Sequence, residues 1–248
     1  GNVRTKDEVV RREFDVGEGD AYNKVMVDRA ERRLKNLGYF KTVRITNEPG
    51  TTPDRVVINV DVEDQSTGQF SIGGGYSTSE GVLAEVGIQE SNLQGRGQYA
   101  RLRGSTGQWS RGVELNFTEP YFLERRLQGG FDLYSKESDN SRFAYYSNVK
   151  TGATLRLGVP LTEEFTVVGR YSLYNNNIKV TDSANVSTAI SSSEGQNLTS
   201  AVGYTLEYNT LDSTINPRNG GLSNLKQDIA GLGGDSRYIR TTTDVKFY

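Results

Sequence analysis

Apolar residues recur with two different periods along this chain, and the change falls near residue 65. Over residues 20–38 they follow a three- and four-residue spacing, which predicts an amphipathic helix. The residues of this predicted face are Tyr22, Val25, Met26, Ala30, Leu34 and Leu37. From Gln69 onward apolar and polar residues alternate, as in strands with one apolar and one polar face. The pattern therefore predicts two domains, over residues 1–65 and 66–248.

The first domain is predicted to open with two helices. The stretch Thr5-Lys6-Asp7-Glu8 has the form of a capping box, which would start a short helix that reaches about Phe14. We expect Asp20 to cap the second helix at its start and Gly38 to end it. Val9, Val10 and Phe14 are the expected apolar contacts of the first helix.

Two alternating segments follow these helices and are predicted to be strands. They lie around Val43 and Ile45 and over residues 56–63, and the turn between them contains Pro49-Gly50 and Pro53. The order of elements is helix, helix, strand, strand, which leaves room for a strand before Gly1. We therefore predict a small α+β domain of the βααββ type.

Basic residues crowd the polar side of the second predicted helix. They are Arg29, Arg32, Arg33 and Lys35. Such a face is usual on an amphipathic helix in water, so one interpretation is a solvated surface. The other is a docking face for a partner protein, and the sequence leaves both open.

The alternating region contains about ten segments of roughly 8–12 residues, the length of a tilted membrane-spanning strand. Charged residues stand in the middle of these segments, on the face that is not apolar. They are Glu85, Arg101, Arg103, Glu114, Arg156, Arg170, Glu207, Arg240, Asp244 and Lys246. Charges suit the wet interior of a barrel better than an exposed soluble sheet, so the pattern favours antiparallel transmembrane β-barrel strands.

Connection lengths and aromatic residues point the same way. The connection after Val159 is short, whereas residues 135–148 and 175–197 form long polar stretches, as in outer-membrane proteins. Aromatic residues near the segment ends are expected to form girdles at the membrane interfaces. They are Tyr76, Tyr99, Tyr121, Phe122, Tyr134, Tyr171, Tyr174 and Tyr208.

Composition narrows the class of protein further. Hydrophobic residues make up 34% of the 248 residues, with 28 Gly and 14 Tyr, and the mean hydropathy is -0.60. A transmembrane helix needs roughly 20 consecutive apolar residues, and no run approaches this length. A soluble β-sandwich fits the same composition, and it would fold without detergent. The formal net charge of -2 gives no support for nucleic-acid binding.

The residue types argue against an enzyme. The chain has no Cys and no His, which removes disulfides, thiolate and imidazole chemistry and most zinc sites. Glu114, Asp132 and Asp244 are candidate carboxylates, but they fall on separate segments and form no catalytic constellation. We predict no catalytic residue, no metal site and no cofactor.

Several collinear motifs resemble one family over nearly the whole chain. The resembling stretches are residues 2–13, Leu37-Gly38-Tyr39-Phe40, residues 70–77, Ser91-Asn92-Leu93-Gln94-Gly95-Arg96-Gly97, Thr118-Glu119-Pro120-Tyr121-Phe122, residues 208–212 and residues 217–221. Together they are similar to the BamA family of outer-membrane assembly factors, whose barrels follow polypeptide-transport-associated (POTRA) domains. Residues 1–65 resemble the last periplasmic POTRA domain, and residues 66–248 resemble the first part of the barrel.

The resemblance implies a function without bond chemistry. Family members fold and insert nascent outer-membrane proteins through a lateral gate at the first barrel strand. It also implies accessory lipoproteins, periplasmic chaperones and the lipid bilayer as partners, in the bacterial outer membrane, with the first domain in the periplasm. The alternative is a related pore of the two-partner secretion or autotransporter assembly type, which translocates polypeptides.

The first barrel strand is where the resemblance places the gate. Its residues are Gln69, Phe70, Ser71, Ile72, Gly73, Gly74, Gly75, Tyr76 and Ser77. A sheet edge presents unpaired N–H and C=O groups, which can pair with an incoming strand. Glycines weaken a strand because they add entropy cost and no side-chain packing. The alternative for Gly73-Gly74-Gly75 is a kink at a barrel corner with no role in gating.

The chain is expected to be part of a longer protein. It opens at Gly1 without Met, and its alternation stops at Tyr248 after about ten segments. An open sheet of that size would leave an edge in lipid, where bare backbone groups are costly. We therefore expect an incomplete barrel whose partner strand for residues 69–77 lies elsewhere.

Overall fold

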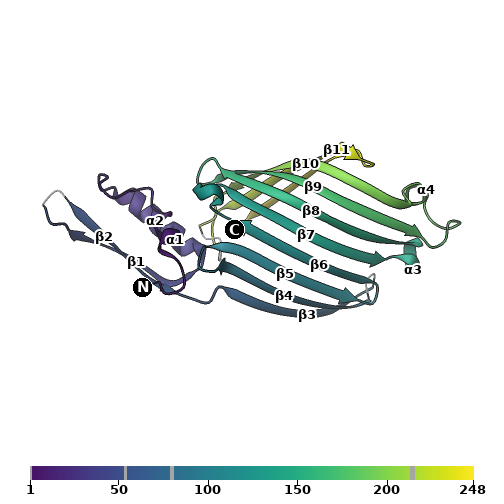
Figure 1. The fold of residues 1–248 in the computed structure, drawn as a ribbon, viewed down its shortest axis with the longest axis horizontal. Coiled ribbons are helices and arrows are strands. Elements are labelled where there is room, and N and C mark those ends of the chain that lie inside the picture. Colours follow the sequence, from purple (N-terminus) through teal and green to yellow (C-terminus); the bar gives the residue numbers. More distant parts are fainter. Residues whose placement is uncertain (1, 53–54, 79–80, 213–215) are drawn as a thin grey trace. The chain divides into compact units, whose positions relative to one another are not determined.

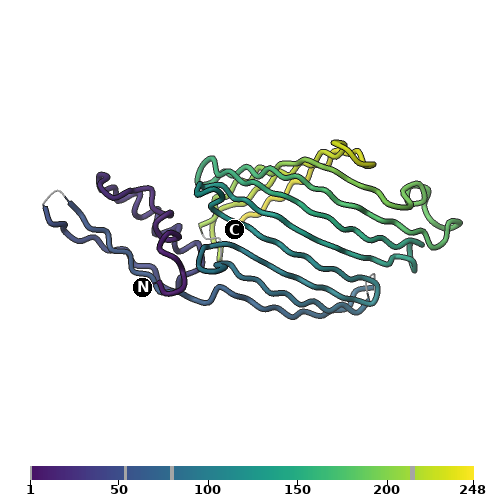
Figure 2. The backbone as a smooth tube through the Cα atoms, viewed as in Figure 1, coloured from purple at the N-terminus to yellow at the C-terminus, as the bar shows by residue number. Residues whose placement is uncertain are grey.

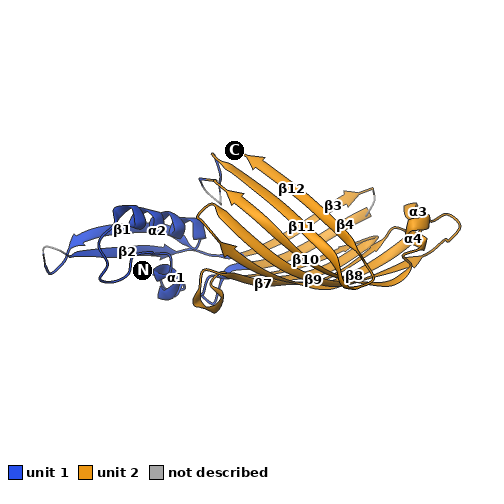
Figure 3. Ribbon diagram, turned by 90° about the horizontal axis from the view of Figure 1, so that it is seen from above, with its two compact units in different colours: residues 1–68, 90–98, 212–218 blue, residues 69–89, 99–211, 219–248 orange. Residues whose placement is uncertain are grey.

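A computed structural model describes residues 2–52, 55–78, 81–212 and 216–248 (Figure 1). The predicted turn residue Pro53 lies outside this set. The chain forms two compact units, coloured separately in Figure 3. The N-terminal unit comprises residues 1–68, 90–98 and 212–218. The sheet unit comprises residues 69–89, 99–211 and 219–248.

The N-terminal unit packs two helices on a two-stranded antiparallel sheet. Its elements are α1 (Asp7–Arg11), α2 (Lys24–Leu37), β1 (Phe40–Pro49) and β2 (Val56–Asp64). The buried core consists of Val9, Val10, Leu34, Tyr39, Phe40 and Val62. It brings together both helices and both strands.

Three details of these helices differ from the prediction. Asn23, and not Asp20, caps α2, because its side-chain oxygen accepts from the N–H groups of Val25 (3.0 Å) and Met26 (3.4 Å). The Asp20 carboxylate accepts instead from the N–H of Gly17 at 2.8 Å. Helix α2 ends as predicted, at Gly38 with a left-handed φ of 71°.

The other two differences concern apolar packing and the capping box. Val25 is 62% exposed, whereas Val27, absent from the predicted face, is buried. Helix α1 starts at Asp7 with no side-chain cap and already ends at Arg11. The hydroxyl of Thr5 donates to Asp64 Oδ1 at 2.6 Å, so a contact with the end of β2 replaces the predicted capping box.

The sheet unit is a ten-stranded meander in which each strand pairs with its sequence neighbours (Figures 1 and 2). Its strands are β3 (Gly68–Ser77), β4 (Gly81–Leu93), β5 (Gln98–Gly107), β6 (Ser110–Glu119), β7 (Gln128–Asp139), β8 (Tyr146–Pro160), β9 (Phe165–Val180), β10 (Gly195–Asn209), β11 (Gly221–Gly234) and β12 (Tyr238–Phe247). Short helices η1 (Phe122–Glu124), α3 (Ser141–Ala144) and α4 (Thr188–Ser191) lie in its connections. The outermost strands are β3 and β12, so the sheet is open, as expected for part of a barrel.

The strand register sorts the side chains into two faces, because residues opposite each other on neighbouring strands point to the same side. One apolar row crosses the sheet from β5 to β12. It consists of Ala100, Phe117, Phe131, Leu155, Tyr171, Val202, Ile229 and Ile239. Most of these side chains are exposed, Leu155 by 59% and Ile239 by 71%, whereas Ala100, Phe117 and Phe131 are half-buried. No helix among the described residues is long and apolar enough to cross a membrane.

Candidate strand-pairing edge and charged face

Strand β3 forms one edge of the sheet and is the predicted pairing strand. Its residues from Gly68 to Tyr76 are all exposed, and Phe70, Ile72 and Tyr76 are 66%, 74% and 74% exposed. The side chain of Gln89 on β4 donates to Gln69 Oε1 at 2.7 Å, and Ser71 Oγ donates to the Gly87 carbonyl at 3.4 Å. Strand β3 thus pairs on one side only.

The glycine triplet of β3 is required neither by space nor by backbone conformation. A Cβ added at Gly73 would lie 3.9 Å from its nearest neighbour, one at Gly74 would lie 3.5 Å away, and one at Gly75 would meet nothing within 4 Å. None of the three has a positive φ. By contrast, a Cβ at Gly152 would lie 2.4 Å from Tyr174 Cβ, so that glycine permits a close approach. The three glycines therefore leave β3 with little side-chain packing.

The second face of the sheet unit carries the mid-strand charges, and most of them are paired. Arg156 Nε lies 2.9 Å from Asp132 Oδ2, which joins β8 to β7. Arg103 pairs with Glu85 and lies 3.9 Å from Glu114. Because these charges lie opposite apolar residues of the same strands, the sheet has one charged and one apolar face, as the alternation predicted.

Arg170 holds three strands together on this charged face. Its side chain is only 8% exposed, and its Nε lies 2.7 Å from Asp228 Oδ1 on β11. It also donates to the carbonyls of Tyr204 (3.1 Å) on β10 and Gln227 (3.3 Å) on β11. A charge-assisted network of this kind fixes strand register across β9, β10 and β11.

The predicted aromatic girdle is wrong at three positions, Tyr99, Tyr134 and Tyr174. Tyr99 stands opposite Thr118, on the same face of β5 as Arg101 and Arg103. Tyr134 and Tyr174 lie on the charged face, where the ammonium of Lys150 stands 5.9 Å and 3.9 Å from their ring centres. Tyr174 also shares a 3.1 Å hydrogen bond with Tyr238. Tyr99, Tyr134 and Tyr174 stand in register with polar-face residues, and one residue along a strand reverses the face. Tyr171 stays on the apolar face, where it lies opposite Leu155.

The structure separates the four basic residues of α2. Arg33 turns toward the short segment after α1, where its Nη1 lies 2.8 Å from Asp15 Oδ2 and 3.1 Å from the Glu13 carbonyl. Lys35 pairs with Glu31 at 2.5 Å within the helix. Arg32 is exposed and Arg29 is half-buried. The docking face stays a prediction, and within it Arg32 and Lys35 are the exposed residues.

A buried polar network in the N-terminal unit was missed by sequence reasoning. Asn92, near the end of β4, is 1% exposed, and its side-chain amide donates to Thr5 Oγ1 at 2.8 Å. Its side-chain oxygen accepts from the N–H of Gly97 at 2.7 Å. The Lys6 N–H donates to the Gly95 carbonyl at 2.9 Å. The end of β4 and the connection to β5 are therefore bound to the start of the chain by both side-chain and backbone groups.

Glycine at position 95 permits this contact. Gly95 has a φ of 72°, and a Cβ there would lie 2.0 Å from the Arg4 carbonyl oxygen. The motif Ser91-Asn92-Leu93-Gln94-Gly95-Arg96-Gly97 was the available signal, because a polar residue followed by two glycines indicates a tight turn. The identity of its contact residues depends on tertiary structure.

Asp64 completes the network at the end of β2. Its carboxylate accepts from the Thr5 hydroxyl (2.6 Å) and from the N–H groups of Val3 and Arg4 (both 2.7 Å). Desolvation by burial opposes ionisation of Asp64, but these hydrogen bonds outweigh it and hold its pKa below the ordinary value. The charged carboxylate therefore binds the first residues of the chain to the end of β2, in the two-stranded sheet of the N-terminal unit.

A POTRA-like unit followed by an open antiparallel sheet with a charged and an apolar face defines a class of outer-membrane proteins. The profile of the Omp85 superfamily domain matches residues 92–248, and the POTRA profile, described as a surface antigen variable number repeat, matches residues 1–65. The chain belongs to the Omp85 superfamily.

Particular relatives sharpen this assignment. The chain is 30% identical to the outer membrane protein assembly factor BamA of Neisseria meningitidis serogroup B, over 98% of this chain and 32% of that protein. It is 30% identical to BamA of Nitratidesulfovibrio vulgaris, over 100% of this chain and 31% of that protein. The chain thus spans about a third of these curated relatives, and the predicted resemblance to the BamA family is confirmed.

Solved structures confirm the fold. BamA from Haemophilus ducreyi lacking POTRA domains 1–3 superposes with a TM-score of 0.73 at 24% identity, covering 99% of this chain and 49% of that one. CdiB from Acinetobacter baumannii gives a TM-score of 0.63 at 14% identity, covering 99% of this chain and 46% of that one. The predicted class, a POTRA domain followed by strands of an incomplete barrel, is therefore correct.

Proposed function

We propose that this chain is part of an outer-membrane protein assembly factor, located in the bacterial outer membrane with its N-terminal unit in the periplasm. In this function the edge of β3 pairs with strands of nascent outer-membrane proteins and opens as a lateral gate. The observation that carries the proposal is the exposed edge strand with three sterically unnecessary glycines. The kinship with BamA proteins supports it.

The physical basis is the cost of bare backbone groups in lipid. Each unpaired N–H or C=O in the hydrocarbon costs several kcal/mol, so an edge there gains by pairing with any strand that reaches it. A strand of glycines gives up little packing when it exchanges one pairing for another. Insertion by strand exchange needs no covalent step, so we propose a function without catalysis, metal or cofactor.

The proposal extends to partners. Accessory lipoproteins and periplasmic chaperones are the partners expected of an assembly factor, and the exposed Arg32 of α2 is the first position to test as a docking residue. Charge reversal by Arg32→Glu would weaken co-purification of such a lipoprotein if this surface binds it. Unchanged co-purification would remove α2 from the docking surface.

Site-specific crosslinking tests the pairing edge. The chain has no native cysteine, so a single cysteine reports one position. Ile72→Cys on β3 should form disulfide crosslinks with cysteines placed along a nascent outer-membrane strand. Leu155→Cys on β8 is the matched control, because it is similarly exposed but lies on an inner strand. Equal crosslinking at both positions would contradict pairing at β3.

The alternative function is a related polypeptide translocation pore, and the fold match to CdiB supports it. A passing polypeptide would contact the charged face and not the edge. Thr154 lies in the recess of that face together with Asp132 and Arg156. Crosslinks from Thr154→Cys to an unfolded secreted polypeptide, without crosslinks from Ile72→Cys, would favour the pore.

A further inference from the structure

The turn between β6 and β7, residues 120–127, presents apolar and basic side chains from a strained backbone. Leu123 and Glu124 have φ of 58° and 56°, in the left-handed region that non-glycine residues rarely occupy. The turn is held by hydrogen bonds from the Phe122 N–H to the Leu127 carbonyl (2.8 Å) and from the Leu127 N–H to the Arg125 carbonyl (2.7 Å). The backbone strain of this turn persists although the turn is well hydrogen-bonded. Such strain indicates that the function of the turn requires its particular shape.

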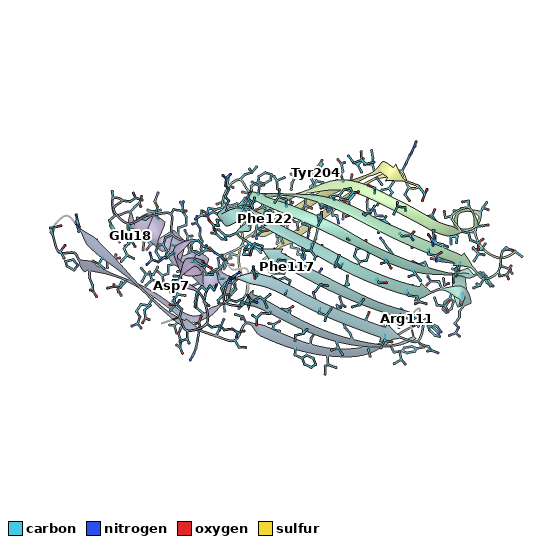
Figure 4. All side chains as sticks on the ribbon, in the orientation of Figure 1. Asp7, Glu18, Arg111, Phe117, Phe122 and Tyr204 are labelled. Carbon is cyan, nitrogen blue, oxygen red and sulfur yellow. The ribbon has the colours of Figure 1, made fainter. Side chains whose placement is uncertain are left out.

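The shape directs apolar groups outward. Leu123 is 70% exposed and Phe122 is 43% exposed. In water such groups would gain by burial elsewhere, so their display points to an apolar environment at this turn. Phe122 is labelled in Figure 4 at the end of the sheet unit where this turn lies.

Phe122 belongs to the apolar face of the sheet. A Cβ at Gly129 would lie 2.8 Å from Phe122 Cγ, so the ring covers the position toward which a Gly129 side chain would point. Gly129 pairs with Leu157, which is two residues from Leu155 and therefore on the apolar face. The aromatic ring thus extends the exposed apolar surface to the very end of the strands.

One exposed carboxylate, Glu124, follows Leu123, and two basic residues come after it. Arg125 and Arg126 are both exposed. The neighbouring Glu119 carboxylate accepts from the N–H of Tyr121 at 3.0 Å. Guanidinium groups bind phosphate through paired hydrogen bonds, and long basic side chains next to an apolar anchor are typical of membrane interfaces.

The next turn at the same end of the sheet has two acidic residues and no basic ones. The antiparallel meander places the β6–β7 and β8–β9 turns at one end, where β3 begins. The β8–β9 turn also exposes a leucine, Leu161, at 60%, but Glu163 and Glu164 follow it. Carboxylates are repelled by lipid phosphates, so this turn provides an internal comparison.

We infer that the β6–β7 turn anchors the sheet in a phospholipid leaflet, with Phe122 and Leu123 among the acyl chains and Arg125 on the headgroup phosphates. This inference rests on the proposed location of the sheet in the outer membrane. At the end where β3 begins, that location corresponds to the periplasmic leaflet. The anchor sets the depth of the strands next to the pairing edge.

Tryptophan fluorescence with lipid quenchers tests the anchor. The chain has one tryptophan, Trp109, so Trp109→Phe provides a silent background. Leu123→Trp, Leu161→Trp and Leu155→Trp are each placed in this background of the full-length protein, in which every tryptophan outside residues 1–248 is likewise replaced by Phe. The variants are reconstituted in phosphatidylethanolamine vesicles with brominated lipids, with and without phosphatidylglycerol.

The anchor predicts a distinct result at each position. Trp at 155 should be quenched by bromines deep in the acyl chains, and Trp at 123 by bromines near the carbonyl groups. Phosphatidylglycerol should increase quenching at 123 roughly twofold but not at 161, and Arg125→Gln should remove that increase.

Three results would overturn the inference in different ways. If 155 is quenched but 123 is quenched no more than 161, the sheet crosses the membrane and the anchor is wrong. If 155 is not quenched either, the proposed location fails and the anchor fails with it. A blue shift at 123 without lipid quenching would indicate a protein contact and would also contradict the lipid anchor.

Discussion

The N-terminal unit and the sheet unit solve the burial of apolar residues in opposite ways. In the N-terminal unit Val9 and Leu34 are 0% exposed, inside a core closed by helices and strands. In the sheet unit Leu155 and Ile239 remain more than half exposed, although they lie in a continuous apolar row. The N-terminal unit buries its apolar residues in its own core. The apolar row of the sheet unit needs an apolar environment outside the protein.

Polar groups show the same contrast. Asn92, Thr5 and Thr67 are buried in the N-terminal unit, and Asn92 and Thr5 hydrogen-bond to each other across 87 positions in sequence. In the sheet unit the charges gather on one face, and ion pairs such as Arg156–Asp132 join neighbouring strands. An amphipathic strand by itself does not show which environment its apolar face contacts. That environment is indicated by which face of the folded sheet stays exposed.

The largest difference between the units should appear on leucine truncation. Leu34→Ala removes a fully buried side chain and should destabilise the N-terminal unit by about 2–5 kcal/mol, because it leaves a cavity. Leu155→Ala should cost only about 1–2 kcal/mol in a bilayer, because lipid fills the space. Denaturant unfolding of the protein in bilayers measures both. Equal costs would contradict the contrast between a closed core and a lipid-facing row.

The glycines of the pairing edge should show the next effect. Ala at positions 73, 74 and 75 together should stiffen β3, since Gly is weaker than Ala in a strand by about 0.5–1 kcal/mol at each position. Outer-membrane protein assembly should then slow by about tenfold, while the fold is retained. Gly104→Ala on inner strand β5 is the control, because an added Cβ there, as at Gly75, would meet nothing within 4 Å. Normal assembly by the triple variant would leave the glycines as a structural feature only.

The buried network gives a smaller effect on stability. Asn92→Ala leaves the Thr5 hydroxyl and the Gly97 N–H without this partner, which should cost about 1–3 kcal/mol. Asn116→Ala removes a 2.7 Å bond to Asp132 on the charged face. Water can replace that bond, so its loss should cost less than about 1 kcal/mol. The two variants are compared by denaturant unfolding, and the reverse ranking would disprove the burial argument.

The smallest effect is the pH dependence from Asp64. Its pKa is lowered in the folded state, so its contribution is fully present above the unfolded value and is lost as pH falls through the folded value. The stability of the N-terminal unit should therefore decline below about pH 4. Asp64→Asn should flatten that decline, while Asp28→Asn at an exposed position should not. An unchanged acid profile in Asp64→Asn would assign the decline to other carboxylates.

Much of the fold could be predicted because alternation is a local property. The period of two along β5 to β12 assigns most side chains to a face, and the ten strands emerged from it. The girdle prediction is wrong at Tyr99, Tyr134 and Tyr174 because it rests on their proximity to a strand end. Their place in the alternation puts them on the charged face. The glycine-rich strand 69–77 was found correctly as β3, and its role in gating stays a prediction.

The start of the chain shows the limit of local motifs. The capping box at Thr5 was plausible in sequence, but Asp64 lies 59 positions away and offers a charged acceptor for the same hydroxyl. Asn23 displaced Asp20 as the cap because the loop after Gly17 uses the Asp20 carboxylate. Competing acceptors decide such cases, and they become visible only when distant segments meet.

The sequence by itself determined the two domain types, the number of strands and the existence of a charged and an apolar face, because helix and strand periods are properties of neighbouring residues. Tertiary structure alone decided that Asn92 is buried and that Phe122 covers Gly129 at the end of the apolar face. Each of these depends on which distant segments pair. Pairing is set by the summed hydrogen bonding and burial of whole strands, and no single motif encodes that sum.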